Sequence, residues 1–182
     1  WGWFPIDKPP ILTVTSGDTV FVDTLSHAGS TQRAHPVESL GELGVEASEI
    51  LQDVIDFWDS RDGRPREGRS GHVITGPIAI AGAEPGDTLE VQVLDLTTRA
   101  PYGINNTGPT SGVFARNYPG TRPSDPQRDI ENARHLYRTI TADGREMALF
   151  SDDIRVPLAP FMGIMAVAPD PVLGQPGVEM PG

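Results

Sequence analysis

With 182 residues and a hydrophobic fraction of 37%, the chain is long enough to form one domain with a real core, or two small lobes that share one. Its net charge of −11 argues against nucleic acid and anionic membrane surfaces as partners, because both are polyanions. The lack of cysteine excludes disulfides, thiolate metal sites and cysteine nucleophiles.

The first predicted elements are two short strands around a turn. Twenty glycines and 18 prolines punctuate the chain, which favours short strands and tight turns over long helices. Residues 11–14 and 19–25 are rich in β-branched side chains, and Ser16, Gly17 and Asp18 lie between them. The pattern therefore predicts strand, turn and strand.

One amphipathic helix is predicted at about 46–59. Apolar residues recur there at helical spacing and form a single stripe, with acidic residues on the opposite side. The stripe consists of Ala47, Ile50, Leu51, Val54, Ile55 and Trp58. We interpret it as a helix that packs on the core.

The rest of the chain predicts more strands and one long excursion. Further short strands are predicted at 72–80, 89–96, 135–141, 146–150 and 162–168. Residues 101–133 are predicted to form a long irregular loop, because they are rich in Pro, Gly, Asn and Arg. The fold class predicted is mainly β, with a sandwich-like or barrel-like arrangement.

Two of the four histidines, His27 and His72, are the candidate metal ligands. Without cysteine, a transition-metal site must use His, Asp or Glu, and no HExxH motif is present, so the fold would have to assemble the site. His27 directly follows a predicted strand and His72 opens another, which are common places for functional residues. His35 and His135 lie in polar surroundings and are expected at the surface.

Serine chemistry receives little support. Ser26 is next to His27, but neighbours on a strand point to opposite faces, and no Gly-x-Ser-x-Gly elbow is present. A serine-type hydrolase using Ser26 or Ser111 stays open as an alternative, as does a non-catalytic β-sandwich that binds a small ligand. No GxGxxG or Walker loop supports nucleotide binding.

Three segments, in order, carry a resemblance to a known family. Residues 75–91 read TGPIAIAGAEPGDTLEV, residues 12–20 read LTVTSGDTV, and residues 160–169 read PFMGIMAVAP. Each resembles a conserved segment of the acetamidase/formamidase family, and together the three span nearly the whole chain.

The resemblance implies a function and a set of site residues. It implies a β-rich sandwich-like fold and hydrolysis of short linear amides to a carboxylic acid and ammonia. It also implies a divalent metal, with zinc as the first expectation and calcium as the alternative. On this basis His27 and His72 are the expected metal ligands, Glu84 is the expected acid–base residue, and Phe161 and Met162 are expected to line the substrate pocket.

The resemblance also bears on organisation and partners. Many members have an Asp-Cys or similar polar pair where this chain has Ser26 and His27, which indicates a subgroup with a different ligand set. The family continues with a PG-x-x-GGN-x-D segment, of which Pro181 and Gly182 match only the start. We therefore expect residues 1–182 to be a single N-terminal region, completed by a missing C-terminal part or a second chain.

Homo-oligomers and a small amide substrate are the other expected partners. No apolar run approaches the roughly 20 residues of a membrane span, and no signal peptide is visible, so a cytoplasmic protein is expected.

Overall fold

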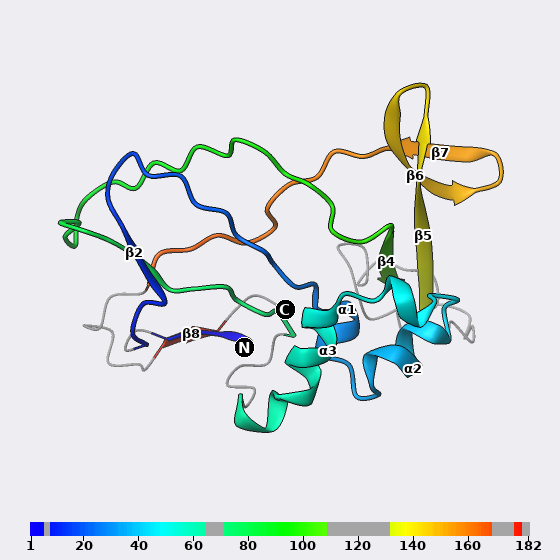
Figure 1. The fold of residues 1–182 in the computed structure, drawn as a ribbon, viewed down its shortest axis with the longest axis horizontal. Helices are drawn as coiled ribbons and strands as arrows, with labels where there is room; N and C mark the ends of the chain where they lie inside the picture. Colours follow the sequence, from blue (N-terminus) through cyan, green and yellow to red (C-terminus); the bar gives the residue numbers. More distant parts are fainter. Residues whose placement is uncertain (6–7, 65–70, 109–131, 169–176, 180–182) are drawn as a thin grey trace, which may run out of the picture. The chain divides into compact units, whose positions relative to one another are not determined.

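The computed structural model describes residues 1–5, 8–64, 71–108, 132–168 and 177–179. The chain forms two compact units, each best followed by itself in Figure 1. The first unit contains Trp1–Ser39, Ile50–Thr97 and Phe161–Gly182, and the second contains Leu40–Glu49 and Thr98–Pro160. Strands outnumber helices in the described residues, which confirms the prediction of a mainly β fold.

Two small sheets belong to the first unit. Strand β1 (Trp3–Pro5) pairs antiparallel with β8 (Gly177–Glu179). Strand β2 (Leu12–Val14) pairs in parallel with β3 (Ile78–Ile80). The two segments that resemble the family signature, 12–20 and 75–91, thus come together as neighbouring strands.

The turns that follow β2 and β3 have the same construction. After β2, the carboxylate of Asp18 accepts hydrogen bonds from the backbone N–H and the hydroxyl of Thr15, both at 2.8 Å, and Gly17 has a φ of 94°. After β3, the carboxylate of Asp87 accepts from the backbone N–H of Glu84 at 2.9 Å. These bonds explain why Gly-Asp occurs in both segments: Gly takes the positive φ and Asp closes the turn.

Short helices complete the first unit. Helix α1 (His27–Ser30) packs against α3 (Gln52–Asp59), which is followed by the 3₁₀ turn η2 (Arg61–Gly63). Helix α2 (Pro36–Gly41) contains a boundary between the two units. None of the helices in the described ranges has the length and apolar character that crossing a membrane requires.

The predicted helix at 46–59 is shorter than expected. Residues Ala47–Glu49 form the 3₁₀ turn η1, and the α-helix begins only at Gln52. Leu51 is extended (φ −61°, ψ 133°), and the Glu49 carboxylate accepts from the backbone N–H of Glu46, so the first turn closes on itself instead of continuing. The buried stripe is made by Ile50, Val54 and Phe57.

The second unit is a four-stranded antiparallel meander. Its strands, in order along the chain and in the sheet, are β4 (Tyr102–Thr107), β5 (Ala133–Ala142), β6 (Arg145–Ser151) and β7 (Ile154–Pro157). Asp143 and Gly144 join β5 to β6 with φ values of 53° and 71°, as a two-residue type I′ hairpin requires. The predicted strands 135–141 and 146–150 are confirmed within β5 and β6.

Strand β4 corrects the prediction of an irregular loop over 101–133. Its six residues pair with β5 from Tyr102 opposite Arg138 to Thr107 opposite Ala133. The sequence Gly103 to Thr107 has weak strand propensity, so the pairing comes from the long-range ladder and not from local preference. Residues 109–131 of the predicted loop lie outside the described residues.

An arginine ties the 40–49 segment to this meander. The Arg138 guanidinium donates to the Glu49 carboxylate and to the Gly44 carbonyl, each at 2.6 Å. The hydrogen bond from Arg138 holds the pKa of Glu49 below its ordinary value. Burial raises the pKa of the neighbouring Tyr102, and the Glu49 charge raises it further. Leu40 and Val45 bury their side chains in the same segment.

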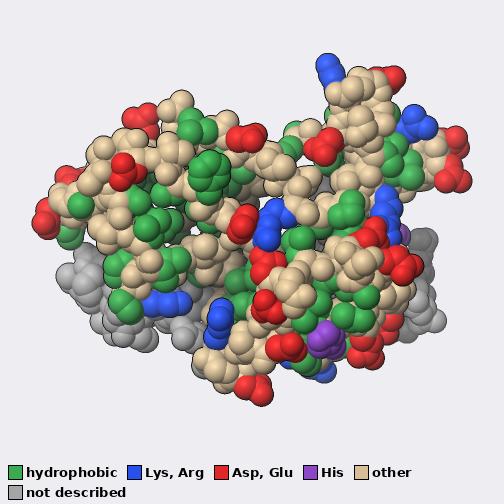
Figure 2. All heavy atoms as spheres, viewed as in Figure 1, with side chains coloured by type: hydrophobic (Ala, Val, Ile, Leu, Met, Phe, Trp, Pro, Cys, Tyr) green, Lys and Arg blue, Asp and Glu red, His purple; other side chains and the backbone are tan. Residues whose placement is uncertain are grey.

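Three other predicted strands do not form ladders in the described residues. Residues 19–25, 89–96 and 162–168 run as extended segments (Figure 1), but none of them has a strand partner within the described ranges. Their apolar side chains are consequently left at the surface, where Figure 2 shows hydrophobic groups among the acidic ones. The exposed set includes Val20, Phe21, Val22, Leu89, Val91, Val93, Leu94, Phe161, Met162, Ile164, Met165 and Val167.

Candidate functional site

Two of the predicted site residues meet in the first unit. The imidazole rings of His27, at the start of α1, and His72, in the segment that leads to β3, lie edge to face. Their centroids are 5.2 Å apart and their planes are inclined by 74°. The fold thus brings together two histidines that are far apart in the sequence.

Local hydrogen bonds fix the backbone around His27. Ser26 is the N-cap of α1, and its hydroxyl oxygen accepts from the backbone N–H of Ala28 at 3.2 Å. The His27 carbonyl accepts from the backbone N–H and the hydroxyl of Thr31, and from the side-chain amide of Gln32, each at 3.1 Å. Three donors on one carbonyl hold the start of α1 in place.

A second set of contacts connects α1 to the helix that supports it. The Gln32 carbonyl accepts from the indole N–H of Trp58 at 3.3 Å and from the guanidinium of Arg61. The same guanidinium lies 4.5 Å from the centre of the Trp58 ring, a cation–π contact. Gln32 therefore links His27, through its side chain, to Trp58 of α3 and Arg61 of η2, through its carbonyl.

The His72 segment is held by contacts with the N-terminal part of the chain. The His72 carbonyl accepts from the backbone N–H of Gly2 at 2.8 Å. The hydroxyl of Thr75 donates to the carbonyl of Asp23 at 3.3 Å. His72 is half-buried, so its ring is sheltered but not sealed from solvent.

The electrostatics at His27 favour its neutral imidazole. Burial of its ring lowers the pKa of His27, and the charge of protonated His72 lowers it further. His27 as a whole residue keeps a large exposed fraction, so the desolvation concerns the side of the ring that faces the protein. A neutral imidazole has a free lone pair, and this is the form that binds metal ions.

The donor chemistry of the pair fits a divalent metal ion in part. Imidazole nitrogens suit zinc, which has three or four protein ligands in most sites. Within the described ranges, no group of three or more His, Asp or Glu side chains is placed to hold a metal ion. The pair accordingly fits as two ligands of a larger set.

Comparison with models of known protein families shows the family to which the chain is related. The model of the acetamidase/formamidase family matches residues 30–176. The chain belongs to the acetamidase/formamidase family. This membership indicates amide hydrolysis as its general activity. Comparisons with curated proteins and with solved structures give no match.

The family match covers most of the predicted site residues. His72, Glu84, Phe161 and Met162 lie inside it, and His27 lies just before its first residue. The histidine pair therefore joins a family-matched segment to a residue that precedes the match.

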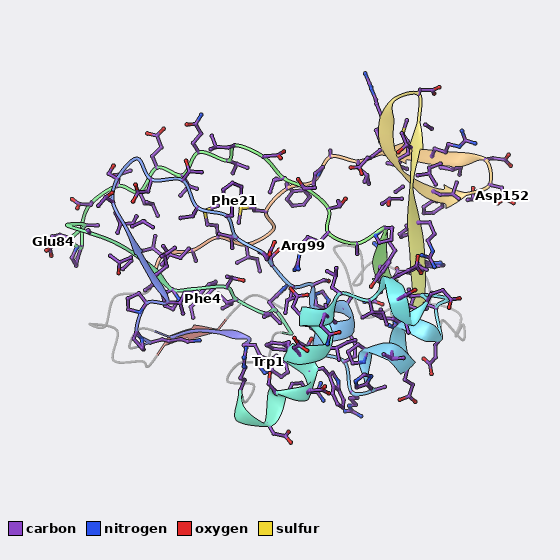
Figure 3. The ribbon with its side chains drawn as sticks, in the orientation of Figure 1. Trp1, Phe4, Phe21, Glu84, Arg99 and Asp152 are labelled. Carbon is purple, nitrogen blue, oxygen red and sulfur yellow. The ribbon has the colours of Figure 1, made fainter. Side chains whose placement is uncertain are left out.

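Glu84 lies in the turn that follows β3, inside the segment that the family model matches. The residue is exposed at the tip of that turn (Figure 3), and its backbone N–H and carbonyl bond to Asp87. Its contribution to the turn thus comes from the backbone, and the carboxylate itself is not what closes the turn. Phe161 and Met162 lie in the exposed segment after Pro160, with Phe161 82% exposed.

The remaining histidines and serines have other surroundings. His35 is half-buried against Trp58, with ring centroids 4.9 Å apart, and its Nδ1 accepts from the backbone N–H of Val37. It thus caps the start of α2, a role that the following Pro at the first helical position could have indicated. His135 is exposed on β5, as expected. The Ser26 hydroxyl is engaged as a helix cap, and Ser111 lies outside the described residues.

Proposed function

We propose that this acetamidase/formamidase family member hydrolyses the C–N bond of short linear amides such as formamide and acetamide, with a divalent metal ion as cofactor. Zinc is the first choice and calcium the alternative. The observation that carries the proposal is the edge-to-face pair of His27 and His72, together with the family match that includes His72. Imidazole ligands favour zinc, because calcium prefers oxygen ligands.

In this proposal His27 and His72 each donate one ring nitrogen to the metal. A bound zinc ion would act as a Lewis acid on the amide carbonyl and lower the pKa of a bound water toward about 7. The hydrogen bonds to the His27 carbonyl keep that residue in place without using its ring. The two ring nitrogens of His27 would then serve a metal ion and a hydrogen-bonding partner.

Glu84 is the proposed acid–base residue. It would take a proton from the attacking water as the new C–O bond forms, and would pass that proton to nitrogen as the C–N bond breaks. The products are then a carboxylic acid and ammonia. Support for this role comes from the place of Glu84 inside the family match and from its exposure; it does not come from proximity, because no third His, Asp or Glu of the described residues is grouped with His27 and His72. Glu84→Gln would remove the proton carrier and keep the shape of the turn.

We further propose that another part of the enzyme or a second chain covers the exposed apolar segments of the first unit, and that the enzyme forms homo-oligomers. The support is the set of exposed apolar side chains on 19–25, 89–96 and 162–168, which is larger than the single, scattered apolar residues that are normal at a protein surface. Phe161 and Met162 belong to this set and would then line the substrate pocket once it is covered.

Ammonia release tests the proposal. Formamide, acetamide and longer amides would be offered to metal-stripped protein and to protein restored with zinc or calcium, with any co-purifying chain retained. The proposal expects release that disappears on stripping and returns with the metal. Ammonia release that is unaffected by chelation would overturn the proposal and favour the serine-type hydrolase. No ammonia release from the metal-restored protein would overturn it and favour the non-catalytic binding module.

A further inference from the structure

Gly71 lies against residues at the two ends of α1, His27 and Thr31. A Cβ atom built on Gly71 would be 3.1 Å from the Thr31 hydroxyl oxygen. It would also be 3.7 Å from the Cβ and 3.9 Å from the Cδ2 of His27. A contact of 3.1 Å is tighter than nine in ten observed contacts of a Cβ, so a side chain here would require the Thr31 hydroxyl to give by a few tenths of an ångström.

The neighbour that would move is connected to His27. The Thr31 hydroxyl donates to the His27 carbonyl at 3.1 Å, and the Thr31 backbone N–H donates to the same oxygen. Pressure on that hydroxyl would therefore reach the hydrogen bonds that fix the start of α1. His72 is the next residue after Gly71, so any widening between the two segments also separates the two rings.

We propose that Gly71 is a positioning residue of the histidine pair: its missing side chain allows the His72 segment to approach α1 closely enough for the two imidazoles to meet. The consequence for metal binding rests on the proposed function. The consequence for the distance between the rings does not, because it follows from contacts within the metal-free protein.

Backbone conformation does not account for glycine at this position. Gly17, Gly76 and several other glycines have a positive φ, which side chains rarely adopt, but Gly71 does not. Alanine is therefore compatible with the backbone at 71, and the Gly71→Ala variant tests only the space that a Cβ would fill.

A matched control is available in the same unit. Gly63 also lacks a positive φ, and a Cβ built on it would have no heavy atom within 4 Å. Gly63→Ala makes the same chemical change and restricts the unfolded chain equally, without a steric contact. Thr31→Ala combined with Gly71→Ala removes the hydroxyl against which the new methyl would press.

The experiment compares these variants in two ways. Nuclear Overhauser effects between the ring protons of His27 and His72, measured in the metal-free protein, report whether the rings still meet. Titration with Zn²⁺, and with Co²⁺ followed by its visible absorption, reports the affinity and the ligand field of the site.

The expected result is a weaker ring-to-ring effect and a loss of about tenfold in Zn²⁺ affinity for Gly71→Ala. Gly63→Ala should match the wild type, and the double variant should recover part of both losses. A Gly71→Ala protein with the wild-type ring-to-ring effect would overturn the proposal. If the wild type bound no Zn²⁺, the zinc form of the proposed function would fail, and the ring-to-ring effects would still decide the role of Gly71.

Discussion

Phe57 is a buried residue of α3, the helix that packs against α1 and so supports the candidate site. It lies on α3, is 6% exposed, and packs edge-on against Trp1 at a centroid distance of 6.3 Å. The Arg64 guanidinium lies 5.9 Å from the centre of the same ring. Truncation to alanine removes a buried ring from the helix against which α1 packs.

The cost of Phe57→Ala follows from this burial. Removal of a buried Phe side chain costs about 3–5 kcal/mol in the free energy of unfolding. For a chain of this size the melting temperature should fall by about 10 °C. All three tryptophans lie in the first unit, so tryptophan fluorescence during urea and thermal unfolding follows that unit even if the two units unfold separately.

Phe21→Ala is the control. Phe21 is fully exposed in the extended segment 19–25 (Figure 3), so its truncation should change the free energy of unfolding by less than about 0.5 kcal/mol. Equal effects of the two substitutions would refute the packing described for α3.

Three further predictions concern the pH response, the second unit and the exposed segments. The pKa of His27 is lowered in the folded protein, so the unfolded chain binds a proton at this residue first as the pH falls, and the stability of the metal-free protein should be complete above about pH 6.5 and decrease below it. Urea unfolding at several pH values should show a smaller decrease in His27→Gln than in the wild type. An equal decrease in both proteins would contradict the assignment to His27. Arg138→Lys should lose the paired hydrogen bonds to Glu49 and Gly44, and amide hydrogen exchange in residues 40–49 should become faster. The control Arg145→Lys should not change this exchange. Equal exchange in both variants would contradict the role of Arg138 in holding residues 40–49. Leu94→Lys should leave the free energy of unfolding within about 0.5 kcal/mol of the wild type, because the Leu94 side chain is 65% exposed. The substitution should weaken the self-association of the protein, measured by light scattering. Unchanged association would argue against a partner on this surface.

Local patterns in the sequence were sufficient for several elements. The strands β5 and β6 follow their β-branched and apolar patterns, and β3 falls inside the predicted 72–80 strand. The two Gly-Asp turns form as their residues indicate, since the hydrogen bonds that close them span only three positions. Elements of this kind depend on neighbours in the chain, which the sequence displays directly.

Elements that depend on distant partners could not be predicted in the same way. Strand β4 has a weak strand composition and exists by its pairing with β5. The Glu49 carboxylate that ends η1 is also bound by Arg138, far along the chain. Helix α1 has a serine N-cap as its local signal. It is only four residues long and contains Gly29 with a φ of 92°, so the sequence shows no helical periodicity there.

The candidate site shows the same division. His27 and His72 could each be selected because they border predicted strands, and the resemblance to the family assigned them a common role. Their contact, however, depends on the packing of α1 against α3 through Gln32 and on the close approach at Gly71. Neither contact leaves a pattern in the sequence, so the geometry of the pair required the structure.

Zinc-dependent turnover in histidine variants is the most direct test of the central claim. Zinc content and ammonia release from formamide and acetamide would be measured for the wild type, His27→Ala, His72→Ala and His135→Ala, the last as a control on an exposed histidine. The account predicts that His27→Ala and His72→Ala each lose zinc and ammonia release together, while His135→Ala keeps both. Full zinc content and full activity in His27→Ala and His72→Ala would contradict it.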